Sequence, residues 1–244
     1  AKTAALALTL TFRLGQVGPM ESRTGGDRAE LPGPWPACGT CQEPLSLLLA
    51  LNLEEFSVLF HEKGQLMLFW CETCCAPEGA PDAAALTRKQ AVVKFVSPGP
   101  AGTLSLQHRS LAERLRGPRR PAMRLEAVPL VSLPSASVLT ASLPCPAADQ
   151  LFEVEWWEQG LSGRAAYQAW VSHGQPVAHL GGHPRLESDD LTPKCPGCGA
   201  FMALDVALVP DPELGLRKHL WLFSCSRTAA CAGLEQPALV TALV

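Results

Sequence analysis

The chain is poor in charge and has no long apolar run, and both absences narrow its function. Asp, Glu, Lys and Arg make up only 18% of the 244 residues, and a net charge of −3 offers no overall basic field that would attract nucleic acid. The longest apolar run, Leu45 to Leu51, is interrupted by one Ser and is far too short to span a bilayer. With 47% hydrophobic residues, the composition is that of a globular chain that forms a core.

Motifs of well-known enzyme sites are also missing. The chain contains no Walker pattern, no G-x-G-x-x-G, no H-E-x-x-H and no G-x-S-x-G. Glu153, Glu155 and Glu158 surround two tryptophans, but no base or nucleophile is paired with them, so they form no acid–base constellation. We therefore expect no catalytic residue and a protein that is not an enzyme.

Cysteine, by contrast, is abundant, and eight of the ten cysteines fall into two quartets. The first quartet is Cys38, Cys41, Cys71 and Cys74, and the second is Cys195, Cys198, Cys225 and Cys231. Two thiolates on a tight turn can occupy one edge of a zinc tetrahedron, and a distant second pair supplies the other edge. The sequence therefore predicts two structural Zn²⁺ ions, each closed by four thiolates with no open position for water.

Two neighbouring side chains could replace a ligand in these quartets. Cys75 directly follows Cys74, and His219 lies six residues before Cys225. The spacing favours Cys74 in the first quartet and Cys231 in the second, and both alternatives stay open.

Several other residues could have a functional role, but a structural role explains them more simply. We interpret His179 and His183 as turn or surface histidines, and Cys145 as a small buried apolar residue rather than a nucleophile. The two Gly-Gly pairs, 25–26 and 181–182, could cradle an anion with their backbone N–H groups, although tight turns explain them better.

The cysteine spacing also predicts a compartment. Close pairs fit metal better than disulfide bridges, and a chain of this size does not need such bridges, so a reducing cytosol is expected. The segment up to Phe12 superficially resembles a signal peptide. However, Leu8 to Leu14 alternates apolar residues with Thr and Arg, and no small-residue cleavage site follows, which predicts a strand instead.

The two quartets belong to two copies of one pattern. Gly25-Gly26 begins 13 residues before Cys38, and Gly181-Gly182 begins 14 residues before Cys195. An apolar stretch follows each CxxC, and a second apolar stretch leads directly into the next cysteine. The chain is therefore predicted to be a tandem duplication of a zinc-stapled unit.

The predicted fold is mainly β (α+β), with two pseudo-symmetric antiparallel β lobes that each carry a four-cysteine zinc knuckle. The lobes are residues 1–97 and 122–244, and a Pro/Gly/Arg-rich linker, 98–121, joins them. Whether the lobes share one sheet is left open. The strands expected from apolar and β-branched runs are Thr9–Leu14, Leu66–Trp70, Ala91–Val96, Leu125–Leu133, Phe152–Trp157, Leu220–Phe223 and Pro237–Val244. Helix is predicted at Asp82–Leu86 and Ser110–Arg116.

Two places could contact a partner. The segment Arg114–Arg124 holds five arginines, among them Arg119 and Arg120, and could bind RNA or an acidic protein, or be a solvated linker. Trp157 would share a strand face with Glu153 and Glu155. This arrangement is either an acidic rim around an aromatic anchor or a strand edge that is kept soluble by charge.

Two stretches resemble known families. The string Arg23–Gly26, followed by Leu31–Pro36 and a CxxC, resembles the YwqG-type bacterial family of unknown function. The second copy, with Leu180–Pro184, Cys195–Gly199 and Leu222–Cys225, is similar to the related programmed cell death protein 2 family. The matches lie within residues 23–75 and 178–231, and the chain departs from a strict repeat in the spacing of its last cysteine pair.

The resemblance implies a mainly-β, two-lobed protein with pseudo-twofold internal symmetry. Eukaryotic relatives are implied to act as dedicated chaperones for a small-subunit ribosomal protein, and some bacterial relatives are implied to sit near toxin–immunity systems.

Together, closed metal sites, missing catalytic motifs and the resemblance predict a non-enzymatic, zinc-stabilised protein-binding module in the cytoplasm. It would be a dedicated chaperone or a toxin-neutralising factor, with no membrane partner. The alternative is a zinc-ribbon protein that binds RNA through Arg114–Arg124, with an affinity that falls steeply with salt.

Overall fold

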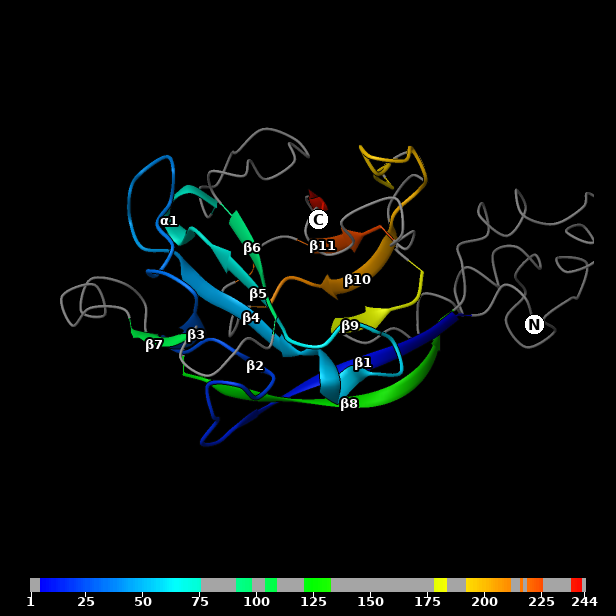
Figure 1. Cartoon of the computed structure of the whole chain (residues 1–244). Coiled ribbons are helices and arrows are strands. Elements are labelled where there is room, and N and C mark those ends of the chain that lie inside the picture. Colours follow the sequence, from blue (N-terminus) through cyan, green and yellow to red (C-terminus); the bar gives the residue numbers. More distant parts are fainter. Residues whose placement is uncertain are drawn as a thin grey trace, which may run out of the picture.

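Strands predominate over helices in the computed structural model of the chain (Figure 1). The structure describes residues 5–75, 91–97, 104–108, 121–132, 178–183, 192–211, 216, 219–225 and 238–242. The strands are β1 (Ala5–Leu14), β2 (Arg23–Thr24), β3 (Arg28–Leu31), β4 (Ser46–Asn52), β5 (Gln65–Trp70), β6 (Ala91–Val96), β7 (Ser105–His108), β8 (Met123–Ser132), β9 (Ala178–Gly181), β10 (Ala203–Leu208), β11 (His219–Ser224) and β12 (Ala238–Ala242). A short 3₁₀ helix, η1 (Leu53–Phe56), and a short α-helix, α1 (Glu72–Cys75), are also present. The predicted mainly-β class is confirmed.

Most of the expected strands form where the apolar runs predicted them. The runs that begin at Thr9, Leu66, Ala91, Leu125, Leu220 and Pro237 correspond to β1, β5, β6, β8, β11 and β12. The expected strand Phe152–Trp157 and both expected helices lie outside the described residues. The predicted linker, 98–121, contains β7, which pairs with β3 in a separate two-stranded sheet.

Ten of the described strands form one antiparallel sheet in the order β12-β11-β10-β9-β1-β8-β2-β4-β5-β6. Strand β1 pairs with β8 along its whole length, from Ala5 opposite Ser132 to Leu14 opposite Met123. Its other edge pairs with β9. A strand of residues 1–97 therefore lies between two strands of residues 122–244, and the two predicted lobes contribute to one continuous sheet.

Each strand of the first half has a counterpart at the corresponding position in the second half. From the centre of the sheet to either edge, these counterparts occur in the same order. The matched strands are β1 with β8, β2 with β9, β4 with β10, β5 with β11, and β6 with β12. This order agrees with a tandem duplication, and the pseudo-twofold relation of the halves in space stays a prediction.

Two β-bulges occur at corresponding places in the two halves. The pairing of β4 with β5 shifts register between Leu47 and Leu49, which leaves Leu48 as the extra residue. The pairing of β10 with β11 shifts between Leu204 and Val206, which leaves Asp205. Each extra residue stands seven positions after the second cysteine of its CxxC. An extra residue bends its strand and increases the local twist, so both halves bend at the same point.

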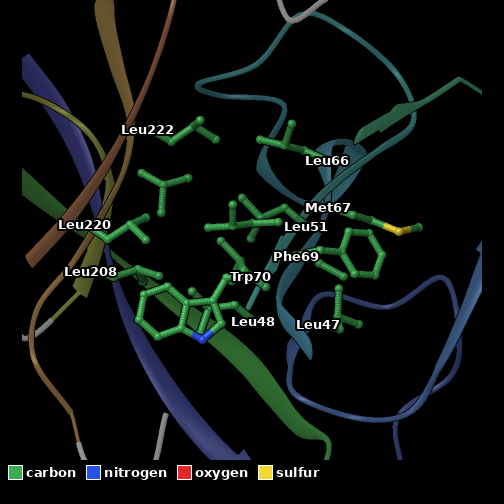
Figure 2. Packing of buried hydrophobic residues seen from close by; sticks show 14 of the residues in the cluster. Leu47, Leu48, Leu51, Leu66, Met67, Phe69, Trp70, Leu208, Leu220 and Leu222 are labelled. Atoms are coloured by element: carbon green, nitrogen blue, oxygen red, sulfur yellow. The ribbon is translucent and has the colours of Figure 1, made fainter. Parts of the chain in front are cut away.

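The sheet curls so that its two halves share one hydrophobic core. Figure 2 shows side chains of β4 and β5 directed toward side chains of β10 and β11. The labelled residues on the two sides are Leu48, Leu51, Leu66 and Trp70, and Leu208, Leu220 and Leu222. All of them are at most 2% exposed and belong to one cluster. Each fully buried leucine contributes about 1.5–3 kcal/mol, so this contact between the halves is a main source of stability.

Both Gly-Gly pairs turn the chain at the end of a strand with positive φ angles, 67° and 88° for Gly25 and Gly26, and 65° and 80° for Gly181 and Gly182. At Gly182 the space is also closed, because a Cβ there would lie 2.6 Å from Ser132 Cβ. These angles favour the tight-turn interpretation of the pairs.

Candidate metal centres

The first quartet gathers at one end of the β4–β5 hairpin. Cys38 and Cys41 lie in the loop between β3 and β4, Cys71 directly follows β5, and Cys74 is in α1. All four sulfur atoms lie within 4.8 Å of one another. The sulfur atoms of Cys41 and Cys71 are 3.5 Å apart, and those of Cys38 and Cys74 are 3.9 Å apart.

Backbone hydrogen bonds hold the Cys38–Cys41 turn in the shape of a knuckle. The Gln42 N–H donates to Cys38 O at 2.9 Å, and the Cys38 N–H donates to Glu43 O at 2.7 Å. The Thr40 N–H points at Cys38 Sγ, 3.4 Å away. Gln42 closes the turn with a φ of 62°, a left-handed conformation that is unusual for a residue other than glycine.

The Cys195–Cys198 turn repeats each of these contacts. The Gly199 N–H donates to Cys195 O at 2.8 Å, and the Cys195 N–H donates to Ala200 O at 2.8 Å. The Gly197 N–H lies 3.4 Å from Cys195 Sγ, and the φ of Gly199 is 70°. The two CxxC segments therefore fold in the same way, as the repeat predicted.

The second group of sulfurs consists of Cys195, Cys198 and Cys225, which directly follows β11. Their sulfur atoms also lie within 4.8 Å of one another, with 3.6 Å between Cys198 and Cys225. Cys231, the expected fourth ligand, lies outside the described residues. Three of the four predicted ligands are thus brought together.

The sulfur distances fit a thiolate-bound metal. Zinc–sulfur bonds of about 2.3 Å in a tetrahedron place the sulfurs about 3.8 Å apart, whereas a disulfide bond is about 2.05 Å long. The separations of 3.5–3.9 Å match the first value, and the four cysteines of the first group form no disulfide. The donor set is that of a soft, tetrahedral metal site.

Burial and hydrogen bonding shift the pKa values of three thiols in the first group. Burial alone would raise the pKa of Cys38, but N–H donors of Cys41 and Thr40 and the thiols of Cys71 and Cys41 lower it to about 7. Burial raises the pKa of Cys71, and burial together with the Cys41 thiol raises that of Cys74 to about 11. The Cys71 and Cys74 thiols are therefore protonated at neutral pH, whereas a bound divalent cation would favour their ionisation.

The first site is built into the shared core. Cys38 and Cys71 are 0% and 2% exposed and belong to the same cluster as the leucines of β4 and β5. Trp35 covers this region, because its ring meets Phe69 edge-on at 5.3 Å and its Nε1 donates to Leu45 O at 2.7 Å. The cysteines of the second site pack with a smaller group of apolar side chains from β10 and β11.

Other predicted candidates take different places. The His219 ring stacks on Trp221 with 5.2 Å between centroids, burial lowers its pKa, and it is not among the groups that gather at the second site. The fourth sulfur of the first site is that of Cys74. His179 lies in β9 and is buried, so its interpretation as a turn or surface histidine is wrong. The His183 N–H donates to Ser132 Oγ at 3.0 Å. Arg119, Arg120, Trp157 and Cys145 lie outside the described residues.

Sequence reasoning missed two buried charged residues. Arg23 is 2% exposed and Asp205 is 6% exposed. The sequence pointed to Arg23 only as the first residue of the Arg23–Gly26 motif, and not as a buried charge. Asp205 had a usable signal, because it is a single acidic residue inside the apolar run Met202–Val209. A carboxyl group in such a run is buried with the strand and must find a partner or lose its charge.

Among the residues that the structure describes, no helix has the length and apolar character needed to cross a membrane. No protein-family model matches the chain, and no curated protein matches it. The resemblance to the YwqG-type and programmed cell death protein 2 families stays a prediction.

Proposed function

We propose that each cysteine group holds one structural Zn²⁺ ion, bound by Cys38, Cys41, Cys71 and Cys74 in the first half and by Cys195, Cys198, Cys225 and Cys231 in the second. The observation that carries this proposal is the gathering of four sulfurs within 4.8 Å at the first site. Bound zinc would link the loop before β4 to the end of β5. Four thiolates leave such an ion no open position for water, so its contribution is to stability.

The metal proposal is tested by zinc content and by neighbouring cysteines. Cys74→Ser should lose one zinc per chain and be strongly destabilised, because structural zinc contributes on the order of 10–16 kcal/mol of apparent binding energy. Cys75→Ser is the matched control, one residue away, and should keep both ions. Elemental analysis of the purified variants distinguishes the two results. Two zinc ions in Cys74→Ser, or iron in place of zinc in the unsubstituted protein, would contradict the assignment.

We propose further that the protein is a non-enzymatic module that binds another protein in the cytoplasm, as a dedicated chaperone or a toxin-neutralising factor. Two features support this function. The four sulfurs of the first group gather in the core, where a metal bound to all of them would have no open position, and cysteines without a disulfide suit a reducing compartment. The duplicated strand order also provides a broad, continuous sheet as a scaffold.

The binding proposal is tested by affinity capture from lysate of the source organism after nuclease treatment, followed by mass spectrometry. A single stoichiometric protein supports it and identifies the partner. Material that is lost at the nuclease step would instead favour the alternative, RNA binding through Arg114–Arg124. Arg119→Ala with Arg120→Ala should then abolish the interaction.

A further inference from the structure

A buried carboxyl group lies at the bulge of β10. Asp205 Oδ1 accepts a hydrogen bond of 2.9 Å from Ser224 Oγ on β11. The other oxygen, Oδ2, is buried and has no hydrogen-bond partner among the described residues. A carboxylate in this position is costly because part of its charge is unsolvated, whereas a neutral carboxyl group is tolerated.

The first half shows that the bulge does not need an acid. Leu48 is the extra residue there and is 1% exposed. Trp70 precedes Cys71 as Ser224 precedes Cys225, and it is also buried. An apolar pair thus occupies in β4 and β5 the place that Asp205 and Ser224 occupy in β10 and β11. The polar pair therefore points to a role beyond forming the bulge.

The surroundings of Asp205 favour its neutral form. Burial raises its pKa, the Ser224 hydrogen bond lowers it, and the charge of Glu62 raises it, with a result of about 7. Glu62 belongs to the first half, between η1 and β5. The other titratable groups on the flanking strands are His179 on β9, which pairs with Ala207, and His219 at the start of β11; Cys225 directly follows β11.

We propose that Asp205 and Ser224 form a proton-operated switch that sets how firmly β10 is held in the sheet. With its proton, Asp205 is neutral and the bulge stays closed on Ser224. When the proton leaves, a buried negative charge remains at the bulge, and opening of β10 toward water relieves it. Val206 and Leu208 of β10 pack in the core shared with the first half, so opening exposes apolar surface where the two halves meet.

The direction of the pH dependence follows from proton linkage. Asp205 has its ordinary pKa of 3.8 when β10 is open to water and about 7 when β10 is closed. Between these values the closed state holds the extra proton, so opening becomes more favourable as the pH rises. The effect levels off above about pH 7, where Asp205 is ionised in both states.

Hydrogen exchange of the full-length protein between pH 5.5 and 8.5, corrected for intrinsic rates, tests the switch. The opening constant of β10 amides should rise roughly tenfold from pH 5.5 to 7 and then level off. Strand β4, with Leu48 at its bulge, is the internal control and should not respond. Asp205→Asn keeps the shape of the side chain but cannot ionise, and it should remove the response of β10.

Two results would overturn the proposal: an unchanged pH response of β10 in Asp205→Asn, or an equal response of β4 and β10 in the unsubstituted protein. If Asp205→Asn does not fold, the ¹³C shift of the Asp205 carboxyl carbon in the unsubstituted protein decides. A titration midpoint near 7 supports the switch, and a midpoint below pH 5 overturns it. Glu62→Gln should lower the midpoint, because it removes a neighbouring negative charge.

Discussion

At the scale of single residues, the position after each CxxC has the same backbone conformation but a different side chain. Gln42 has a φ of 62° and Gly199 a φ of 70°. The left-handed conformation costs a residue other than glycine about 1–2 kcal/mol. Glycine avoids this cost, but its unfolded state has more conformational entropy, which offsets part of the advantage. The two knuckles therefore differ in strain although they share their hydrogen bonds.

This difference predicts opposite effects of two substitutions. Gln42→Gly should raise the free energy of unfolding by about 0.5 kcal/mol, and Gly199→Ala should lower it by about 1 kcal/mol. A Cβ at Gly199 would meet nothing within 4 Å, so the loss comes from the backbone alone. Urea unfolding at fixed zinc concentration measures both. A stabilising Gly199→Ala would show that the left-handed angle is not required.

Gly182 combines a positive φ with a closed space. A Cβ there would lie 2.6 Å from Ser132 Cβ and 3.0 Å from Ala7 Cβ, where β8, β1 and β9 meet. Gly182→Ala should therefore destabilise the protein by about 2–4 kcal/mol, from backbone strain and overpacking together. Gly15→Ala is the control, because a Cβ at Gly15 has nothing within 4 Å. Similar thermal midpoints for the two variants would contradict the crowding at Gly182.

At the scale of elements, β2 has only two residues and relies on one side chain to order the loops around it. The Arg23 guanidinium is buried, and burial lowers its pKa to about 10, which leaves it charged at neutral pH. It donates to the carbonyl groups of Gly18, Pro19, Glu21 and Arg28, at 2.6–3.1 Å. One side chain thus holds the turn before β2 and the start of β3.

A lysine side chain cannot replace the forked guanidinium group of Arg23, because its ammonium group donates all of its hydrogen bonds from one nitrogen atom. Arg23→Lys should leave buried carbonyl groups without donors and lower the free energy of unfolding by about 2–3 kcal/mol. Arg124 lies opposite Arg23 in the β2–β8 pair and is exposed, so Arg124→Lys is the matched control and should change little. Equal stabilities of the two variants in urea would show that the hydrogen bonds of the Arg23 guanidinium group do not contribute to the free energy of unfolding.

The elements also show what the sequence could predict. Strands such as Ala91–Val96 and clustered cysteines such as Cys71 and Cys74 follow from local patterns, because strand periodicity and CxxC spacing extend over only a few residues. The order of the strands in the sheet does not follow from local patterns. Ala5 pairs with Ser132, far along the chain, and many strand registers are compatible with the same alternation of apolar and polar residues. The burial of Asp205 does not follow from local patterns either, since its environment is formed by Ser224 and Glu62 from distant segments.

At the scale of the whole molecule, the halves are joined through the centre of the sheet. Strand β1 lies between β8 and β9, and β8 lies between β1 and β2, so each half inserts its first strand into the other. Removal of one half would leave the partner strand with an open edge and would uncover the core that Leu51 and Leu66 share with Leu220 and Leu222. Among the described residues, each half therefore depends on the other to pair β1 or β8 and to cover this part of its apolar surface.

A cut between β7 and β8 tests this dependence. With a specific protease site inserted within residues 109–120, cleavage should leave both fragments in one complex of unchanged mass, which gel filtration and native mass spectrometry would show. The cut complex should still unfold in a single transition, because the ten-residue β1–β8 pair and the common core couple the halves. The uncut protein with the same insertion is the control. Fragments that separate in native buffer, each folded with its own metal, would mean that residues 1–97 and 122–244 are independent domains despite the continuous sheet.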